Sequence, residues 1–233
     1  IGLSGAFGTV HVGNNYTPMF NQSGSGFDPN GFTNMPAYMV SNLMSFTAQN
    51  SLDYTAPKII DGLGIQLNKG FANKESSTDG DSFGWGFSYS ASGFSAGIGG
   101  EKTNKTEIGN GFVKVLSPSN VKDVNKLSLA AAYDFGSAKV SIHRIESKSG
   151  SVDNTAMGVG VAIPLGSFTL NGNYSNLKTK GADSATDNRS FDAYQLGANY
   201  SLSKRTSLYL LTGQFKTDGD PLKMTSLGVV HSF

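Results

Sequence analysis

Apolar residues alternate with small or polar residues along most of this chain, with a period of two. Around Trp85, for example, Phe83 and Phe87 are each separated from it by a single glycine. Because successive side chains of a strand point to opposite faces, each such run predicts a strand with one apolar face. About twelve strands are predicted in this way, near residues 6–13, 50–57, 63–71, 82–91, 93–102, 126–135, 138–147, 155–165, 167–178, 191–201, 206–216 and 223–233.

The connections between these runs alternate between short and long. Short turns are predicted at residues 90–93, 136–137, 166–167 and 202–205, and longer polar loops at residues 72–81, 103–125, 148–154, 179–190 and 217–222. A soluble β-sandwich also shows alternation within its strands, so the strand pattern alone does not decide the class. Short turns at one end and long loops at the other favour an antiparallel up-and-down barrel of the outer-membrane type.

The aromatic residues on the apolar parity fall close to both kinds of connection. Those beside the short turns are Tyr89, Phe94, Tyr133, Phe135, Phe168, Tyr200, Tyr209 and Phe233, and those near the long loops are Phe71, Phe83, Tyr174, Tyr194 and Phe215. Two aromatic belts around a band of aliphatic residues predict two membrane interfaces. No stretch approaches the ~20 apolar residues of a spanning helix. The predicted fold class is therefore all-β, a transmembrane antiparallel up-and-down β-barrel.

Composition excludes several kinds of chemistry. The chain has 30 glycines and no cysteine, so thiol catalysis and thiolate metal sites are excluded. A formal net charge of +1 gives no reason to expect nucleic acid as a partner. The sequence begins at Ile1 without a charged and then apolar leader, so we expect a secretory signal to have been removed or to lie outside this sequence. No metal site and no cofactor are predicted.

Three stretches resemble the Gram-negative general porins of the neisserial and beta-proteobacterial branch. Residues 2–13 resemble the fourth and fifth strands of that family, and residues 202–209 resemble its last turn and penultimate strand. Residues 229–233 resemble its closing segment, which generally reads Gly-Leu-Arg-His-x-Phe. The resemblance spans the whole chain and corresponds to the C-terminal three-quarters of the family.

This resemblance implies a trimeric, 16-stranded diffusion porin of the outer membrane, with about four N-terminal strands absent from this chain. The lipid bilayer and lipopolysaccharide would surround it, and ions and small hydrophilic solutes would pass through it. The terminal Phe233 would be the signal read by the barrel-insertion machinery. Val230 and Asn14 stand where the family usually has arginine, so strong anion selectivity is not predicted.

Residues 14–49 form a long polar and aromatic stretch that is punctuated by glycine and proline, which is the composition of a structured loop. This stretch lies where the resemblance places the pore-constricting loop. A lumen that holds such a loop and still conducts fits ~16–18 strands better than twelve. An open sheet is not viable in hydrocarbon, because its edge N–H and C=O groups would lack partners. Either further strands lie outside this chain, which we favour, or the barrel is narrower and closed.

The ionisable residues predicted to face the lumen are the candidate pore residues. They are Asp53, Glu101, Asp134, Lys139 and His143, with His11 and Lys216 as further candidates and Asp28 in the constriction loop. A charge that faces water costs little, whereas the same charge facing lipid costs several kcal/mol. Acidic groups on the loop opposite basic groups on the wall would create a transverse field that sorts solutes. The alternative is that these are ordinary solvated lining residues.

Two glycine clusters are similar to nucleotide-binding loops out of context. They lie at residues 97–100 and 158–160, but no Lys-Ser/Thr pair and no helical pattern follows either of them. We therefore predict that they mark close packing on the lumen face.

The predicted function is passive diffusion of ions and small hydrophilic solutes rather than catalysis. A catalytic barrel would need a Ser, His or Asp constellation at one end, and the three histidines are far apart in the predicted meander. A substrate-specific channel and a structural or adhesive barrel remain as alternatives.

Overall fold

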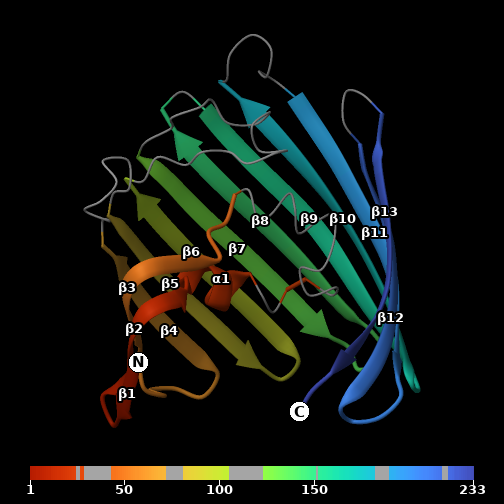
Figure 1. The fold of residues 1–233 in the computed structure, drawn as a ribbon, viewed down its shortest axis with the longest axis horizontal. Helices are drawn as coiled ribbons and strands as arrows, with labels where there is room; N and C mark the ends of the chain where they lie inside the picture. Colours follow the sequence, from red (N-terminus) through yellow and green to blue (C-terminus); the bar gives the residue numbers. More distant parts are fainter. Residues whose placement is uncertain are drawn as a thin grey trace.

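The computed structural model describes residues 1–24, 27–28, 43–71, 81–104, 123–150, 152–181, 189–216 and 220–233. Within these residues the chain forms one sheet of thirteen strands and one helix (Figure 1). The elements are β1 (Gly2–Gly5), β2 (Gly8–Tyr16), α1 (Pro18–Ser23), β3 (Thr47–Thr55), β4 (Leu63–Gly70), β5 (Ser82–Ala91), β6 (Phe94–Thr103), β7 (Val124–Asp134), β8 (Lys139–Ser149), β9 (Val152–Leu165), β10 (Phe168–Lys180), β11 (Arg189–Ser201), β12 (Thr206–Lys216) and β13 (Leu222–His231).

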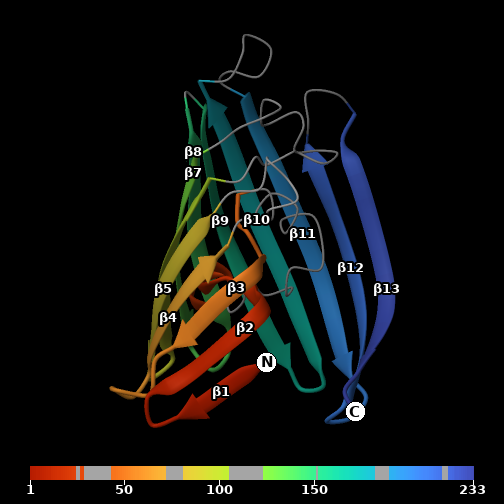
Figure 2. The same ribbon diagram turned by 60° about the vertical axis from the view of Figure 1, so that its left-hand side comes forward.

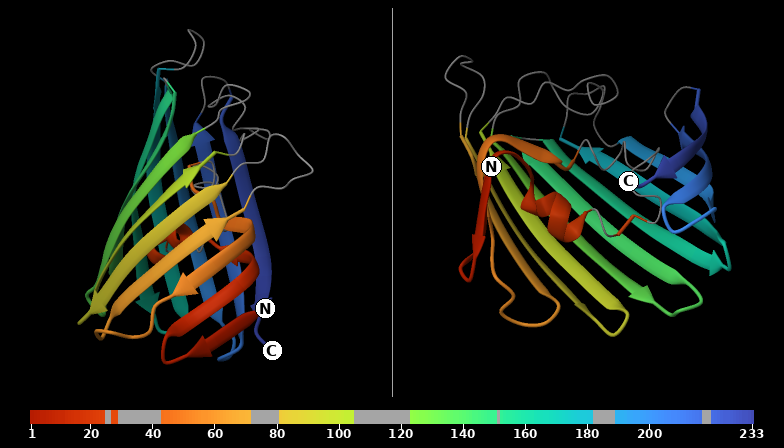
Figure 3. Two further views of the ribbon diagram at one scale, coloured as in Figure 1. Left: turned by 90° about the vertical axis from the view of Figure 1, so that its left-hand side faces the viewer. Right: turned by 60° about the horizontal axis from the view of Figure 1, so that its bottom comes forward.

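Every strand pairs with its neighbours in sequence, and each described pairing is antiparallel, from β1 at one edge to β13 at the other. The sheet curves strongly, and α1 lies against its concave face (Figures 2 and 3). The four turns predicted to be short, at residues 90–93, 136–137, 166–167 and 202–205, all lie at one end of the strands, which is also where the C-terminus lies. The predicted up-and-down antiparallel class is confirmed as a partial barrel. Among the described residues, no helix is long and apolar enough to cross a membrane.

The first predicted strand, residues 6–13, corresponds to β2, and a short strand that the pattern did not predict, β1, precedes it. Gly5 of β1 pairs with Gly8 of β2, and the turn between them is formed by Ala6 and Phe7. Gly8 has a φ of 103°, a backbone conformation that a residue with a side chain rarely adopts. The glycine is what lets so tight a turn form, and this turn joins β1 to β2, so the structure has one strand more than the twelve predicted.

The predicted loop at residues 148–154 is mostly strand. β8 continues to Ser149 and β9 begins at Val152, and these two residues pair across the hairpin. Lys148 and Asp153 also pair with each other and are both exposed. The sequence pattern fails here because the outward positions become charged near the end of the strands, so the apolar alternation disappears while the strand continues.

Eleven of the thirteen predicted belt aromatics are exposed, whereas Tyr209 and Phe215 are not. Phe215 pairs with Ala193, is 3% exposed and packs in a buried cluster on the concave face. Tyr209 pairs with the inward-facing Asn199. Both assignments were therefore wrong, because β12 carries apolar residues on both parities and the outward parity is that of Leu210.

Candidate pore constriction

The long predicted loop enters and leaves the sheet at one point. β2 continues to Tyr16 and β3 begins at Thr47, so the connection comprises residues 17–46, within the predicted 14–49. The backbone N–H of Thr17 donates to the carbonyl of Phe46 over 2.9 Å, and the Thr17 hydroxyl donates to the carbonyl of Ser45 over 2.6 Å. The ring of Phe20 lies 5.1 Å from that of Phe46. These contacts close the base of the loop.

Helix α1 begins the loop because its sequence starts with a strong capping signal. The Thr17 hydroxyl accepts a hydrogen bond from the N–H of Phe20 over 3.1 Å, and Pro18 occupies the first helical position. At the other end, the Ser23 hydroxyl donates to the carbonyl of Met19 over 2.8 Å. The helix is therefore locally specified before it packs on the wall.

Four inward-facing glycines of β5 and β6 form the surface on which α1 lies. They are Gly84, Gly86, Gly97 and Gly99. A Cβ at Gly97 would collide with the carbonyl oxygen of Gln22, and a Cβ at Gly99 would lie 2.6 Å from the Cα of Met19. Helix and sheet approach this closely only because these positions lack side chains. The predicted close packing of the glycine cluster at residues 97–100 is confirmed on this face.

Asp53 anchors the wall beneath α1 rather than lining open water. Its carboxylate accepts hydrogen bonds from Gln66 Nε2 over 2.7 Å and from Asn68 Nδ2 over 3.3 Å, and the residue is 2% exposed. The oxygen of the same Gln66 amide accepts hydrogen bonds from Asn21 over 3.0 Å and from Gln22 over 3.3 Å. Asp53 thus orients the amide that receives the helix.

Glu101 also holds the loop, together with a lysine that the sequence analysis missed. Lys126 of β7 pairs directly across from Glu101 of β6, and its Nζ lies 4.0 Å from Glu101 Oε1. The Ser45 hydroxyl bridges the two, since it donates to Glu101 Oε1 over 2.7 Å and accepts from Lys126 Nζ over 2.9 Å. Both charged side chains are less than 10% exposed. Lys126 lies on the inward parity of its strand, and that parity could have identified it.

An apolar cluster fixes the other side of the loop. The concave faces of β8 to β12 contribute Ile145, Ala156, Leu177, Phe191, Ala193 and Phe215, and the loop contributes Met19, Leu43 and Met44. The Phe191 and Phe215 rings stack with their centroids 5.9 Å apart. Full burial of one such side chain contributes roughly 1.5–3 kcal/mol. The loop therefore packs on the wall as on a hydrophobic core.

Asp28 lies against the wall rather than across the lumen from it. Its carboxylate accepts a hydrogen bond from Asn173 Nδ2 of β10 over 3.1 Å and interacts electrostatically with His143 of β8. The His143 ring lies over Gly158, where an added Cβ would be 2.6 Å from Nε2. The structure thus brings together Asp28 and His143 among the predicted pore residues.

The other candidates lie apart from this pair. His11 is exposed on β2, where it pairs with Asp53 and its ring covers Gly2. Asp134 accepts a hydrogen bond from the N–H of Gly136 over 2.8 Å in the short turn after β7, and it pairs with Lys139.

Lys216 faces outward, opposite Asp192, so its assignment to the lumen was wrong. The cause is the same parity error that misplaced its neighbour Phe215.

Phe233 is fully exposed, and its ring lies 4.8 Å from that of His231.

Comparisons with known proteins agree with this geometry. The sequence profile of the Gram-negative porin family matches residues 1–220. The major outer membrane protein P.IB of Neisseria gonorrhoeae is 26% identical over 255 residues, which cover all of this chain and 72% of that protein.

Two solved structures are similar in fold. An anion-selective porin from Comamonas acidovorans has a TM-score of 0.72 at 20% identity and is matched over 76% of its chain. Outer-membrane expressed OmpT of Vibrio cholerae has a TM-score of 0.75 at 14% identity and is matched over 78% of its chain. In the two alignments, 100% and 99% of the present chain are covered.

Proposed function

Because this chain belongs to the Gram-negative porin family and forms an outer-membrane channel for the diffusion of solutes, we propose that the loop within residues 14–49 is its constriction. The observation that carries the proposal is the attachment of this loop to the concave face of the sheet. α1 lies on the glycines of β5 and β6, and Ser45 bridges the buried Glu101–Lys126 pair. A loop held inside the channel narrows the cross-section that remains for water and solutes.

Asp28 is the proposed charge filter of this constriction. Among the loop residues that the structure describes, Asp28 is the one acidic residue. Two wall groups beside it are the neutral amide of Asn173 and the imidazole of His143. Glu101 and Lys126 contribute less because they form a pair of opposite charges, and Asp53 contributes less because it is 2% exposed beneath α1. One structural relative is named anion-selective, and a carboxylate in the constriction would oppose that preference in the present channel.

We also propose that further strands close the barrel and that three copies assemble in the membrane. β1 and β13 each pair on one side only in the described residues, and an unpaired strand edge in hydrocarbon costs several kcal/mol per group. One solved structure of OmpT of Vibrio cholerae is a trimer form. The lipid bilayer and lipopolysaccharide would surround the outward face, and ions and small hydrophilic solutes would pass along the concave one.

Single-channel recording in a planar bilayer tests the channel directly. We expect stepwise, voltage-stable conductance that rises linearly with solute concentration and needs no cofactor. Saturable conductance that a sugar or nucleotide blocks competitively would indicate a substrate-specific channel instead. A correctly folded sample that never conducts but turns over a peptide or lipid substrate would refute the proposal.

A further inference from the structure

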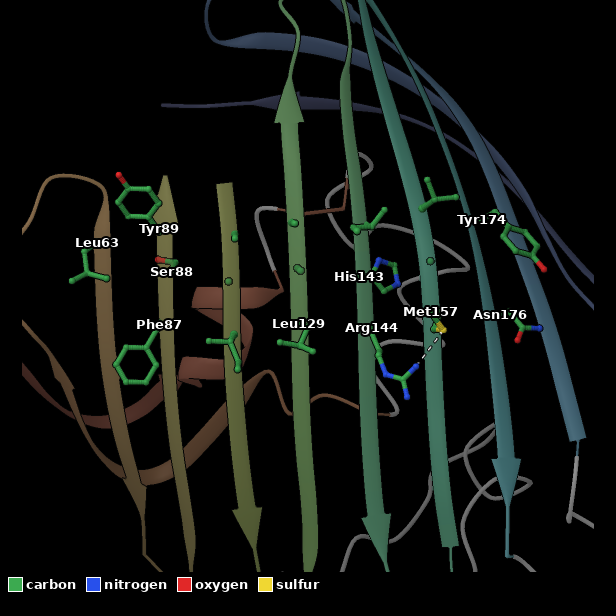
Figure 4. Close-up of a pocket in the computed structure, with 18 residues that line it drawn as sticks. Leu63, Phe87, Ser88, Tyr89, Leu129, His143, Arg144, Met157, Tyr174 and Asn176 are labelled. Carbon is green, nitrogen blue, oxygen red and sulfur yellow. Dashed lines mark hydrogen bonds between the residues drawn. The ribbon is translucent and has the colours of Figure 1, made fainter. Parts of the chain in front are cut away.

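Two buried polar atoms converge above Gly158 on the concave face of β9. Gly158 pairs with His143 of β8 on one side and with Ser175 of β10 on the other. A Cβ at Gly158 would lie 2.6 Å from both His143 Nε2 and Ser175 Oγ. In Figure 4 the imidazole of His143 projects from β8 towards β9, the strand that carries Met157. The missing side chain of Gly158 therefore leaves room at a point that both atoms approach.

Neither of these two atoms has a hydrogen-bond partner within the described part of the chain. His143 Nε2 and Ser175 Oγ are both buried atoms, and Ser175 is 0% exposed. A buried polar atom without a partner costs free energy, so native proteins supply one from the chain, from water or from an ion. Two such atoms that approach the same point indicate one ligand bound between them.

The constriction loop brings a carboxylate to the same place. Phe27 packs in a buried cluster with Ala130, the residue of β7 that pairs with His143. The next residue of the loop, Asp28, interacts electrostatically with His143. Its carboxylate also accepts a hydrogen bond from Asn173 Nδ2 of β10 over 3.1 Å. Contacts with β7 and β10 thus hold Asp28 beside the imidazole of β8.

We propose that His143 Nε2, Ser175 Oγ and the Asp28 carboxylate bind one divalent transition-metal ion of the zinc type. An imidazole nitrogen beside a carboxylate favours zinc over magnesium or calcium, because those two ions prefer oxygen ligands alone. Zinc binds nitrogen and oxygen at about 2.0–2.2 Å, so one ion just above Gly158 contacts both wall atoms, and water of the lumen completes its coordination. The ion joins the loop to the wall.

The ion also adds two units of positive charge beside Asp28. Bound zinc therefore makes the constriction less favourable for cations and more favourable for anions. Only this effect on ion preference rests on the proposed role of Asp28 as the charge filter, whereas the binding of the metal depends on the three ligands alone.

Isothermal titration with zinc chloride tests the site in the full protein, purified without a histidine tag as its folded assembly in detergent. We expect one zinc ion per chain. H143Q should bind zinc at least about 100-fold more weakly, because loss of even an outer-shell partner costs about 10–100-fold in metal affinity. H11Q is the matched control, since His11 shares the concave face but lies on β2, opposite Asp53 and apart from the site. It should bind zinc as the unaltered protein does.

The variant S175A distinguishes a metal ligand from a residue that only packs. Loss of the hydroxyl should weaken zinc binding about tenfold. The zinc-free variant should nevertheless unfold at a higher temperature than the zinc-free unaltered protein, because a buried hydroxyl without a partner is removed. Unchanged zinc affinity in S175A would show that Ser175 only packs and would overturn the proposed ligand set.

Two other results overturn the proposal outright. One is the absence of zinc binding, which would assign the two wall atoms to water, and the other is equal zinc affinity in H143Q and the unaltered protein. Reversal potentials in a KCl gradient are recorded in parallel, and zinc should shift them towards chloride in the unaltered protein but not in H143Q. Zinc binding without this shift supports the metal site and contradicts the role of Asp28 as the charge filter, so the two failures are distinguished.

Discussion

Replacing Lys126 by methionine should loosen the constriction loop without disturbing the strand that carries it. Methionine has a similar length and fills the space of the lysine stem, so the concave face of β7 keeps its packing. The change removes the ammonium group that donates to Ser45 and lies beside Glu101. The Glu101 carboxylate, whose side chain is 6% exposed, then stays buried without its cation as long as the loop is docked.

The magnitude follows from that burial. Removing one partner of a buried ion pair costs about 3–5 kcal/mol, because the remaining charge is uncompensated. The lower end applies here, since the Ser45 hydroxyl still donates to Glu101 over 2.7 Å. When the loop undocks, Glu101 meets the water of the lumen and the cost disappears. About 3 kcal/mol is therefore subtracted from the free energy of undocking, which corresponds to roughly a hundredfold increase in the undocked population.

Hydrogen–deuterium exchange of the loop base and α1 measures this population. The amides of Thr17, Asn21 and Gly24 are hydrogen-bonded to protein carbonyls over 2.9–3.0 Å, so they exchange when the loop opens. In K126M we expect roughly hundredfold faster exchange and increased current noise in single channels. K102M, which alters an outward-facing lysine of the adjacent strand, is the control. The double variant E101Q/K126M should recover most of the protection, because no charge is left buried. Protection in K126M within threefold of the unaltered protein, or no recovery in the double variant, would refute the reasoning.

Three other changes test the remaining parts of the channel. In D28K, two units of charge change in the constriction, and at ~10 Å in water this is worth about 0.8 kcal/mol for a monovalent ion, or about fourfold in its permeability. The change favours chloride and disfavours potassium, so the reversal potential in a KCl gradient should report a shift of about 16-fold in the permeability ratio towards chloride. An unchanged potential would place Asp28 outside the solute path. G97A should displace α1, because the new Cβ collides with the carbonyl of Gln22, and the amides of α1 should then exchange faster. The control is G172A, at an outward-facing glycine where an added Cβ would have its nearest neighbour 3.4 Å away, and it should behave as the unaltered protein. Deletion of Phe233 should reduce the amount of folded channel recovered from membranes while refolding in detergent proceeds normally; equal membrane yields would show that this residue is not an assembly signal.

Much of the fold could be predicted from the sequence, because strands between an apolar and an aqueous phase must alternate. The prediction failed where that contrast weakens. In β12, Leu208, Leu210 and Leu211 are apolar on both parities, since its inward positions pack under the loop instead of facing water. The outward parity was therefore assigned incorrectly for Tyr209 and Phe215. Near residues 148–154 the outward positions are charged, as at Lys148 and Asp153, since the strands extend beyond the apolar band.

The candidate site was harder to predict. The parity of a residue predicts which face of the sheet its side chain is on, but it does not predict whether that side chain is exposed to water or buried. Asp53 and Glu101 were correctly placed on the concave face, yet hydrogen bonds and burial make them anchors of the loop. Lys126 is the informative omission, since the partner that explains it, Glu101, is on the preceding strand and lies opposite only once the register is known. Contacts such as Asn173 to Asp28 join residues 145 positions apart, which no local pattern reveals.

Several kinds of interaction hold the loop, and three of them resist changes in the salt around the channel for different reasons. The glycine surface of β5 and β6 acts through shape, so salt and pH leave it unchanged. The cluster around Phe191 and Met44 acts through burial of apolar area, which salt does not screen. The Glu101–Lys126 pair is electrostatic, but its two side chains are 6% and 3% exposed, and buried pairs are screened much less than surface pairs. A constriction to which these three contacts contribute keeps its geometry while the ionic strength outside the cell varies. Charge at the half-buried Asp28 can then vary the preference for ions independently of the width of the pore.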